Sequence, residues 1–409
     1  MKKRLVTGSI ILLSALLVGC SSSSKSAGTE GKTNIRFSTW DSEKDLDAQQ
    51  ALVDKFNESQ EEIFVTLEAY GSEYDTKITA GMGAKDAPDV MYMWNFPQYY
   101  EALEPLNDLI ANEGADYKDN FYETLWNYNS IEDSIYGIPV GFTTHVVYYN
   151  KDLFDANNVA YPEDGWTWEQ LEATAQKLTN NAQNEVGYVV PGKPDPYDFE
   201  MFFWGNDTAF SDENGKIEGV LNNEKSIEVL DSFQKMLKEG TAIVSEGSGT
   251  TEMETNKVGM YVNGSWTIQT LQDSGINFGT VTIPGRNGNE GASILSSSGL
   301  AISKNSENKE AAFEFIKYWT SEEANESRIA YELPVLKSVV AKHDLENDAI
   351  KGPFYQMLLR SDAFVPSSFK VKNWSTVSAD LELAFEQVFN PSSLENPKTA
   401  LDSVVESNK

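Results

Sequence analysis

The segment from Tyr136 to Phe154, YGIPVGFTTHVVYYNKDLF, constrains the fold more than any other stretch of this chain. Residues 146–149 form an apolar run without polar alternation, which is typical of a strand that is covered on both faces. Gly137 and Gly141 flank Pro139, so the backbone can bend just before this strand. A buried strand that is entered through a bend predicts a crossing between two lobes.

The length of the chain also favours two lobes. After the N-terminal segments described below, roughly 380 residues remain, which is more than one hydrophobic core usually supports. Patterns typical of strands and helices alternate along these residues, and this alternation predicts an α/β fold. Further crossings are expected near residues 296–303 and 333–335.

Several short motifs resemble family 1 extracellular solute-binding proteins of the maltose and multiple-sugar type, the sugar-binding lipoproteins of bacterial ABC importers. They are Tyr136-Gly137-Ile138-Pro139, the YNKDLF of residues 149–154, the WTWEQL of residues 166–171 and the Pro-Asp-Val of residues 88–90. The resemblance implies a two-lobed, type II periplasmic-binding-protein-like fold. Each lobe would be a mostly parallel sheet flanked by helices, and hinge crossings would join the lobes.

The resemblance also implies a function. A monomer without a cofactor would capture a sugar or oligosaccharide in the cleft between the lobes and deliver it to the transmembrane subunits of an ABC permease. We expect the N-terminal lobe to comprise residues 33–141 and 296–333, and the C-terminal lobe residues 142–295 and 334–409.

The N-terminus has the pattern of a lipoprotein signal peptide. Residues 1–4 are basic, and the apolar core at residues 5–18 is shorter than the about 20 residues of a membrane span. The sequence Leu-Val-Gly-Cys at residues 17–20 resembles a lipobox, which predicts cleavage after residue 19 and a lipid on Cys20, the only cysteine. Residues 20–32 would then be a lipidated, flexible tether. The alternatives are an ordinary signal peptide with an incidental cysteine and an uncleaved anchor.

The charge narrows the classes of partner. The formal net charge is −31, and a surface this acidic repels nucleic acid and anionic lipid and disfavours a highly anionic ligand. No second apolar segment is long enough to span a bilayer. We therefore expect an extracytoplasmic protein that is held at the outer face of the cell membrane by its lipid alone.

Tryptophans follow several predicted strands. Trp40 and Trp94 end strands before the first crossing, and Trp266 follows a strand after it. Ligands bind at the carboxyl ends of strands in open α/β sheets, and an indole can stack on the apolar face of a pyranose. We predict that these three indoles face one cleft. Further candidates are Trp204 and Trp374, whereas Trp168 and Trp319 lie on apolar helix faces and are assigned to cores.

Polar candidates accompany these tryptophans. Asp41 and Asn95 directly follow Trp40 and Trp94, and a carboxylate is a good acceptor for vicinal hydroxyls. Capping of the next helix is an alternative role for Asp41. The remaining candidates have alternative packing roles or lie near a crossing, and they are Tyr74, His145 and Glu332.

Patterns of metal and catalytic sites are missing from the sequence. Two histidines and no available thiol argue against a zinc site, and the adjacent Tyr148 and Tyr149 point to opposite faces of a strand. There is no Walker motif and no Gly-x-Ser-x-Gly elbow. We expect no metal, no cofactor and no catalytic residue. Two alternatives remain open: a binding protein for a polyamine or peptide, and a secreted glycoside hydrolase.

Overall fold

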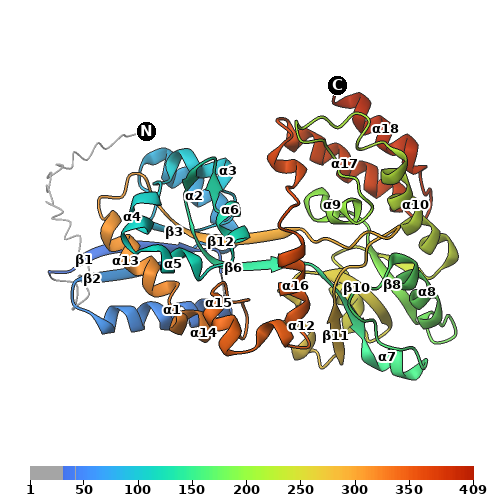
Figure 1. Cartoon of the computed structure of the whole chain (residues 1–409), viewed down its shortest axis with the longest axis horizontal. Coiled ribbons are helices and arrows are strands. Elements are labelled where there is room, and N and C mark those ends of the chain that lie inside the picture. Colours follow the sequence, from blue (N-terminus) through green and yellow to red (C-terminus); the bar gives the residue numbers. More distant parts are fainter. Residues whose placement is uncertain (1–30, 42) are drawn as a thin grey trace, which may run out of the picture.

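Two five-stranded sheets form the centres of two lobes that lie side by side in the computed structural model (Figure 1). The structure describes residues 31–41 and 43–409. The predicted signal peptide and Cys20 lie outside the described residues, and so does Ser42. The expected α/β fold with two lobes is confirmed. No helix in the described part of the chain is both long enough and apolar enough to cross a bilayer.

The sheet of the N-terminal lobe has the order β2-β1-β3-β12-β6. β1 pairs in parallel with β2 and β3, whereas β12 pairs antiparallel with β3 and β6. Four of its strands therefore run in one direction, and β12 runs against them. The bounds are β1 (Thr33–Thr39), β2 (Ile63–Ala69), β3 (Val90–Met93), β6 (Ile138–Thr144) and β12 (Leu295–Ile302).

The sheet of the C-terminal lobe has the order β11-β7-β10-β8-β9. β8 pairs in parallel with β9 and β10, and β7 pairs antiparallel with β10 and β11. Again one strand runs against four, and it is the strand that arrives from the other lobe. The bounds are β7 (Val146–Asn150), β8 (Val186–Pro191), β9 (Ala242–Ser245), β10 (Val258–Asn263) and β11 (Phe278–Val281).

Helices cover both sheets (Figure 1). Beside the N-terminal sheet lie α1 (Glu43–Ser59), α2 (Tyr74–Ala84), α3 (Phe96–Tyr99), α4 (Asn107–Asn112), α5 (Ala115–Asp119), α6 (Glu123–Tyr128), α13 (Lys309–Trp319), α14 (Glu322–Arg328) and α15 (Lys337–Lys342), with the small ribbon β4 (Ser130–Ile131) and β5 (Ser134–Ile135). The helices of the C-terminal lobe are α7 (Lys151–Ala156), α8 (Trp168–Leu178), α9 (Pro196–Trp204), α10 (Glu224–Glu239), α11 (Thr250–Glu254), α12 (Thr267–Asp273), α17 (Trp374–Phe389) and α18 (Pro397–Ser407). α16 (Gly352–Arg360) lies between the lobes and contacts both β6 and β7.

Three segments connect the lobes. The first is the junction of β6 and β7 at His145, and the second runs from β11 to β12. The third includes α16, whose Phe354 carbonyl accepts a hydrogen bond of 2.8 Å from the Thr144 hydroxyl. Before it, α15 packs on α14, and Leu336 forms a β-bridge with Phe121. The chain therefore stays beside the N-terminal lobe until α16, which is later than the crossing expected near residues 333–335. The division of the whole chain into lobes by the residue boundaries given above stays a prediction.

Local signals in the sequence account for several elements. Thr167 and Gln170 form the capping box that begins α8, and Gly240 ends α10 in the left-handed conformation at φ 70°. β7 is buried along its whole length, in agreement with its unbroken apolar run. Trp168 and Trp319 are 1% and 0% exposed, which confirms their assignment to cores.

Candidate functional site

A cavity of about 490 Å³ lies between the two lobes, and we call it the inter-lobe cleft. One wall of the cleft belongs to the N-terminal lobe and consists mainly of the segment after β3 and of α6. The opposite wall belongs to the C-terminal lobe and consists of α9, Trp266 and the segment that leads into α17. The lining residues are Trp94, Asn95, Pro97, Tyr128, Asp195, Tyr197, Asp198, Trp266, Ser296, Ser368, Phe369 and Trp374.

Two exposed indoles from opposite lobes line this cleft. Trp94 directly follows β3 and is 45% exposed, and Trp266 follows β10 and is 53% exposed. Asn95 lies beside Trp94 and donates a hydrogen bond of 2.9 Å to Gln98. An exposed indole in a concave site offers a flat apolar face and an N–H donor to a ligand. The structure thus brings together four of the residues that the sequence singled out, since Trp374 also lines the cleft.

A second pocket of about 270 Å³ adjoins the cleft, and we call it the adjoining pocket. It shares Asp195, Asp198 and Trp266 with the cleft, so the two spaces meet at these three side chains. The rest of its wall is mainly apolar and comes from β8, α9 and α10. His145 and Asn263 are among its polar lining residues.

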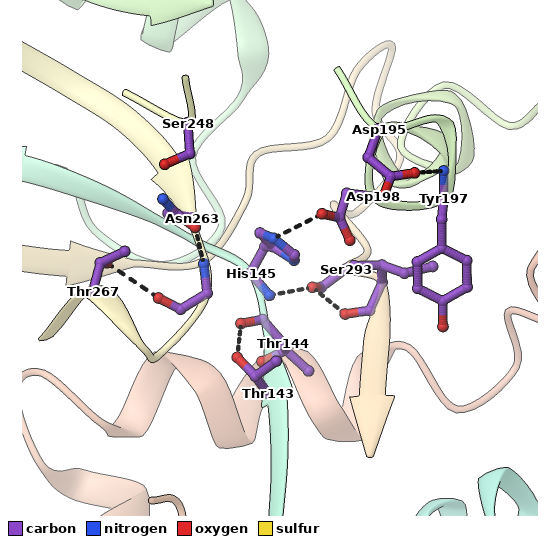
Figure 2. Close-up of polar contacts among 12 residues, drawn as sticks. Thr143, Thr144, His145, Asp195, Tyr197, Asp198, Ser248, Asn263, Thr267 and Ser293 are labelled. Carbon is purple, nitrogen blue, oxygen red and sulfur yellow. Dashed lines mark hydrogen bonds and ion pairs between the residues drawn. The ribbon is translucent and has the colours of Figure 1, made fainter. Parts of the chain in front are cut away.

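His145 lies where β6 passes into β7, at the centre of Figure 2. Its backbone N–H donates a hydrogen bond of 2.6 Å to the hydroxyl of Ser293, which belongs to the second connecting segment. Its ring meets Trp266 edge-on at 5.4 Å, and its Nε2 lies 3.8 Å from Asp198 Oδ2. Burial lowers the pKa of His145 to about 4, so the imidazole is neutral at pH 7.

Asp195 and Asp198 project from the beginning of α9 (Figure 2). Asp195 is the N-cap and accepts a hydrogen bond of 2.9 Å from the backbone N–H of Tyr197, while Pro196 occupies the first helical position. Burial, and then the neighbouring charge of Asp195, raise the pKa of Asp198 to about 7. Two acceptor groups thus face the place where the cleft and the adjoining pocket meet.

Three further candidates form a cluster at the end of β1 and do not line either space. Trp40 is half-buried and makes edge-on contacts with Tyr74 at 5.4 Å and with Tyr92 at 4.6 Å. The Tyr74 side chain is buried and donates a hydrogen bond to the carbonyl of Tyr92. Asp41 accepts hydrogen bonds from the Thr39 hydroxyl, at 3.1 Å, and from the Gln49 amide. The binding role of these residues stays a prediction.

Glu332 and Trp204 also lie outside the cleft. Glu332 accepts hydrogen bonds of 2.7 Å from the Tyr92 hydroxyl and from Arg328 Nε, so its carboxylate already has two partners. Trp204 is 5% exposed and stacks on Phe364 at 5.2 Å, beside a separate cavity of about 740 Å³ in the C-terminal lobe. Their roles as ligand contacts stay predictions.

Sequence reasoning missed several residues that line the cleft, among them Tyr128, Asp195, Asp198 and Phe369. A signal was available for two of them. Asp195 before Pro196 is a typical helix start, and it would have identified α9 within the aromatic run. The helix alone, however, does not reveal which of its ends reaches the cleft. Among the described residues there is no group of three or more His, Cys, Asp or Glu side chains that could hold a metal ion.

Comparison with known proteins agrees with this architecture. The family described as bacterial extracellular solute-binding protein matches residues 51–352. An arabinooligosaccharide-binding protein of Bacillus subtilis is 26% identical over 247 residues, which are 59% of this chain and 55% of the relative. The first curated relatives are therefore matched over less than two thirds of their length.

Solved structures share the fold of almost the whole chain. An ABC substrate-binding protein from Listeria monocytogenes, in complex with cycloalternan, has a TM-score of 0.77 at 24% identity and covers 92% of this chain and 98% of its own. A UgpB from Mycobacterium tuberculosis, in complex with glycerophosphocholine, has a TM-score of 0.78 at 18% identity and covers 92% and 98%. The two-lobed arrangement of these sheets and the match over residues 51–352 lead to one conclusion: the chain belongs to the family of bacterial extracellular solute-binding proteins.

Proposed function

We propose that this protein is the carbohydrate-binding component of an ABC importer, and that it captures a sugar or oligosaccharide in the inter-lobe cleft. The observation that carries the proposal is the pair of exposed indoles, Trp94 and Trp266, which line one cavity from opposite lobes. A sugar that stacks on both rings contacts both lobes at once, so its binding energy favours the closed arrangement of the lobes. The closed form would then deliver the sugar to the permease.

The relatives support a sugar as the ligand. The arabinooligosaccharide-binding protein and the cycloalternan complex carry oligosaccharides in their names. The glycerophosphocholine complex has the same fold, and a non-sugar solute is therefore the second candidate. Stacking faces favour the sugar, because a polyamine and the backbone of a peptide have no ring face to lay on an indole.

A protein of this family binds its solute and is not an enzyme, and we propose that this chain leaves its ligand unaltered. The test has two steps. A thermal-shift screen of mono- and oligosaccharides, with polyamines and short peptides as the comparison set, identifies the ligand, because a ligand that binds only the folded state raises the melting temperature. The purified protein is then incubated with that ligand for a day, and the ligand is analysed.

Two results would contradict the proposal. Stabilisation by a polyamine or a peptide and by no sugar would move the function to the non-sugar alternative. Cleavage of many sugar molecules per protein molecule would indicate a glycoside hydrolase. We expect stabilisation by a sugar and its complete recovery.

A further inference from the structure

The junction of the cleft with the adjoining pocket is acidic and lacks a cationic partner. Asp195 and Asp198 line both spaces. Lys193 is the only lysine or arginine among the residues that line them in the described part of the chain, and it pairs with Glu386 at 3.0 Å. Since His145 is neutral at pH 7, it does not balance the carboxylates either.

A second, independent observation points to a ligand at the same place. The His145 side chain is 5% exposed, lines the adjoining pocket, and its Nδ1 has no hydrogen-bond partner among the described residues. A buried polar atom without a partner costs free energy unless a ligand or water meets it. Figure 2 shows this imidazole between Asp198 on one side and Asn263 on the other.

The chemistry of these groups specifies the partner. When both side chains are ionised, the two carboxylates offer only acceptor atoms, and a neutral imidazole adds either one lone pair or one N–H at its free nitrogen. An ammonium group has three donors, no acceptor and a positive charge, so it satisfies the carboxylates better than a hydroxyl does. Trp266, which borders both spaces, adds a ring whose face attracts cations and sugar C–H groups alike.

We propose that the ligand carries an ammonium group, as an amino sugar does, and that Asp195 and Asp198 bind this group where the cleft meets the adjoining pocket. The inference rests on the proposed function, because it takes a sugar ring to lie between Trp94 and Trp266. An amino sugar accounts for both features of the site: the ring faces meet the indoles, and the amine meets the carboxylates.

The test compares sugars that differ in one group. Glucose, N-acetylglucosamine and glucosamine, together with their β-1,4-linked trimers, carry a hydroxyl, an acetamide or an ammonium at the same carbon. Calorimetric titration of the wild-type protein should show that the ammonium member binds about tenfold or more tightly than its matched neutral sugars, the effect expected of a partly buried charge pair. The preference should weaken as salt is added.

Substitutions locate the effect. Asp198→Asn should reduce the preference for the ammonium member to within about threefold while neutral sugars keep their affinity. Asp195→Asn should act in the same direction, and the fold should persist because asparagine caps a helix as well as aspartate does. Asp231→Asn is the matched control: Asp231 is exposed on α10, lines neither space, and its removal changes the net charge equally. This variant should keep the full preference.

The remaining outcomes separate the two proposals. Equal or tighter binding of the neutral sugars overturns the ammonium inference and leaves the sugar-binding function intact. The same conclusion follows if the wider screen identifies a sugar ligand and none of the amino sugars binds. A preference that survives both substitutions overturns the assigned site. If no sugar binds in either experiment, the proposed function fails and this inference fails with it.

Discussion

Exposure divides the tryptophans of this chain into those that a ligand can cover and those that the fold has already covered. Trp94 and Trp266 keep about half of their surface open, whereas Trp168 is buried among the aromatic rings of α9 and α10 and beneath Arg286. The first kind contributes little to the stability of the free protein. The second kind contributes stability and has no free face for a ligand.

This difference predicts opposite results for two substitutions. Trp266→Ala should weaken sugar binding about tenfold or more, since it removes a stacking face, and should change the melting temperature little. Trp168→Ala should lower the free energy of unfolding by about 3–5 kcal/mol, because it opens a cavity, while the molecules that remain folded bind normally. Calorimetric titration and thermal melts measure the two effects. A Trp266→Ala variant that melts far below wild type yet binds normally would refute the assignment.

His145 predicts a pH dependence of stability. Its pKa is about 4 in the folded protein and about 6.5 in an unfolded chain, so its contribution is complete above pH 6.5 and is lost as the pH falls from 6.5 to 4. The loss at pH 4 is on the order of 3 kcal/mol. Asp198, with its pKa raised to about 7, has the opposite dependence and is partly solvent-exposed. Its effect is therefore smaller.

A substitution isolates this contribution. Chemical denaturation of wild type and His145→Gln at pH 7 and pH 4.5 should show a larger loss of stability in the wild type, because glutamine does not titrate. Equal losses in the two proteins would mean that the imidazole is hydrated or paired in the folded state, contrary to its burial.

The same residues show what sequence reasoning can reach. Trp40, Trp94 and Trp266 all follow strands, and this position led to the prediction that they line the cleft. Two of them, Trp94 and Trp266, do so. Trp40 obeys the same rule, but Tyr74 and Tyr92 cover its ring from α2 and β3. Such covering depends on which distant side chains fill the space, and no local pattern encodes it.

At the scale of elements, the close contact of β8 with α8 predicts a strong effect. A Cβ atom at Gly187 would lie 2.0 Å from the backbone oxygen of Ala175, and a helix backbone cannot yield as a side chain can. Gly187→Ala should therefore destabilise the protein by about 1–3 kcal/mol or more, as overpacking does. Denaturant unfolding measures the change.

Gly83→Ala is the matched control. Gly83 lies within α2 and has open space around its missing side chain. Alanine there should stabilise the protein by about 0.5–1 kcal/mol, since it restricts the unfolded chain and favours the helix. Equal effects of the two substitutions would contradict the packing seen between β8 and α8.

Elements differ in how far they can be predicted for a physical reason. The start of α8 and the end of α10 depend on a capping box and on a glycine, which act within one turn. β12 already begins at Leu295, because Ser296, Ser297 and Ser298 pair with β6. Serines have no strong preference for strands, and only the neighbouring strand determines their conformation.

At the scale of the whole molecule, the lobes and the predicted lipid anchor occupy separate parts of the sequence. The described fold begins at residue 31, and Cys20 precedes it. We predict that Cys20→Ser releases the protein from the membrane fraction without changing its affinity for sugar. Cell fractionation followed by calorimetric titration of the released protein checks both statements. Retention of the variant in membranes would show that the anchor lies elsewhere.

The position of β12 in the N-terminal sheet has a consequence for the order of folding. β12 lies between β3 and β6, with Gly299 opposite both Met93 and Pro139, so these two strands have no direct contact through which to pair. About 150 residues separate the end of β6 from the beginning of β12, and all five strands of the other lobe's sheet lie within them. A chain that is synthesised from its N-terminus therefore exposes one unpaired edge on β3 and one on β6 until residue 302 has been made. Synthesis of the N-terminal lobe begins first, but its sheet is completed only after most of the C-terminal lobe has been synthesised.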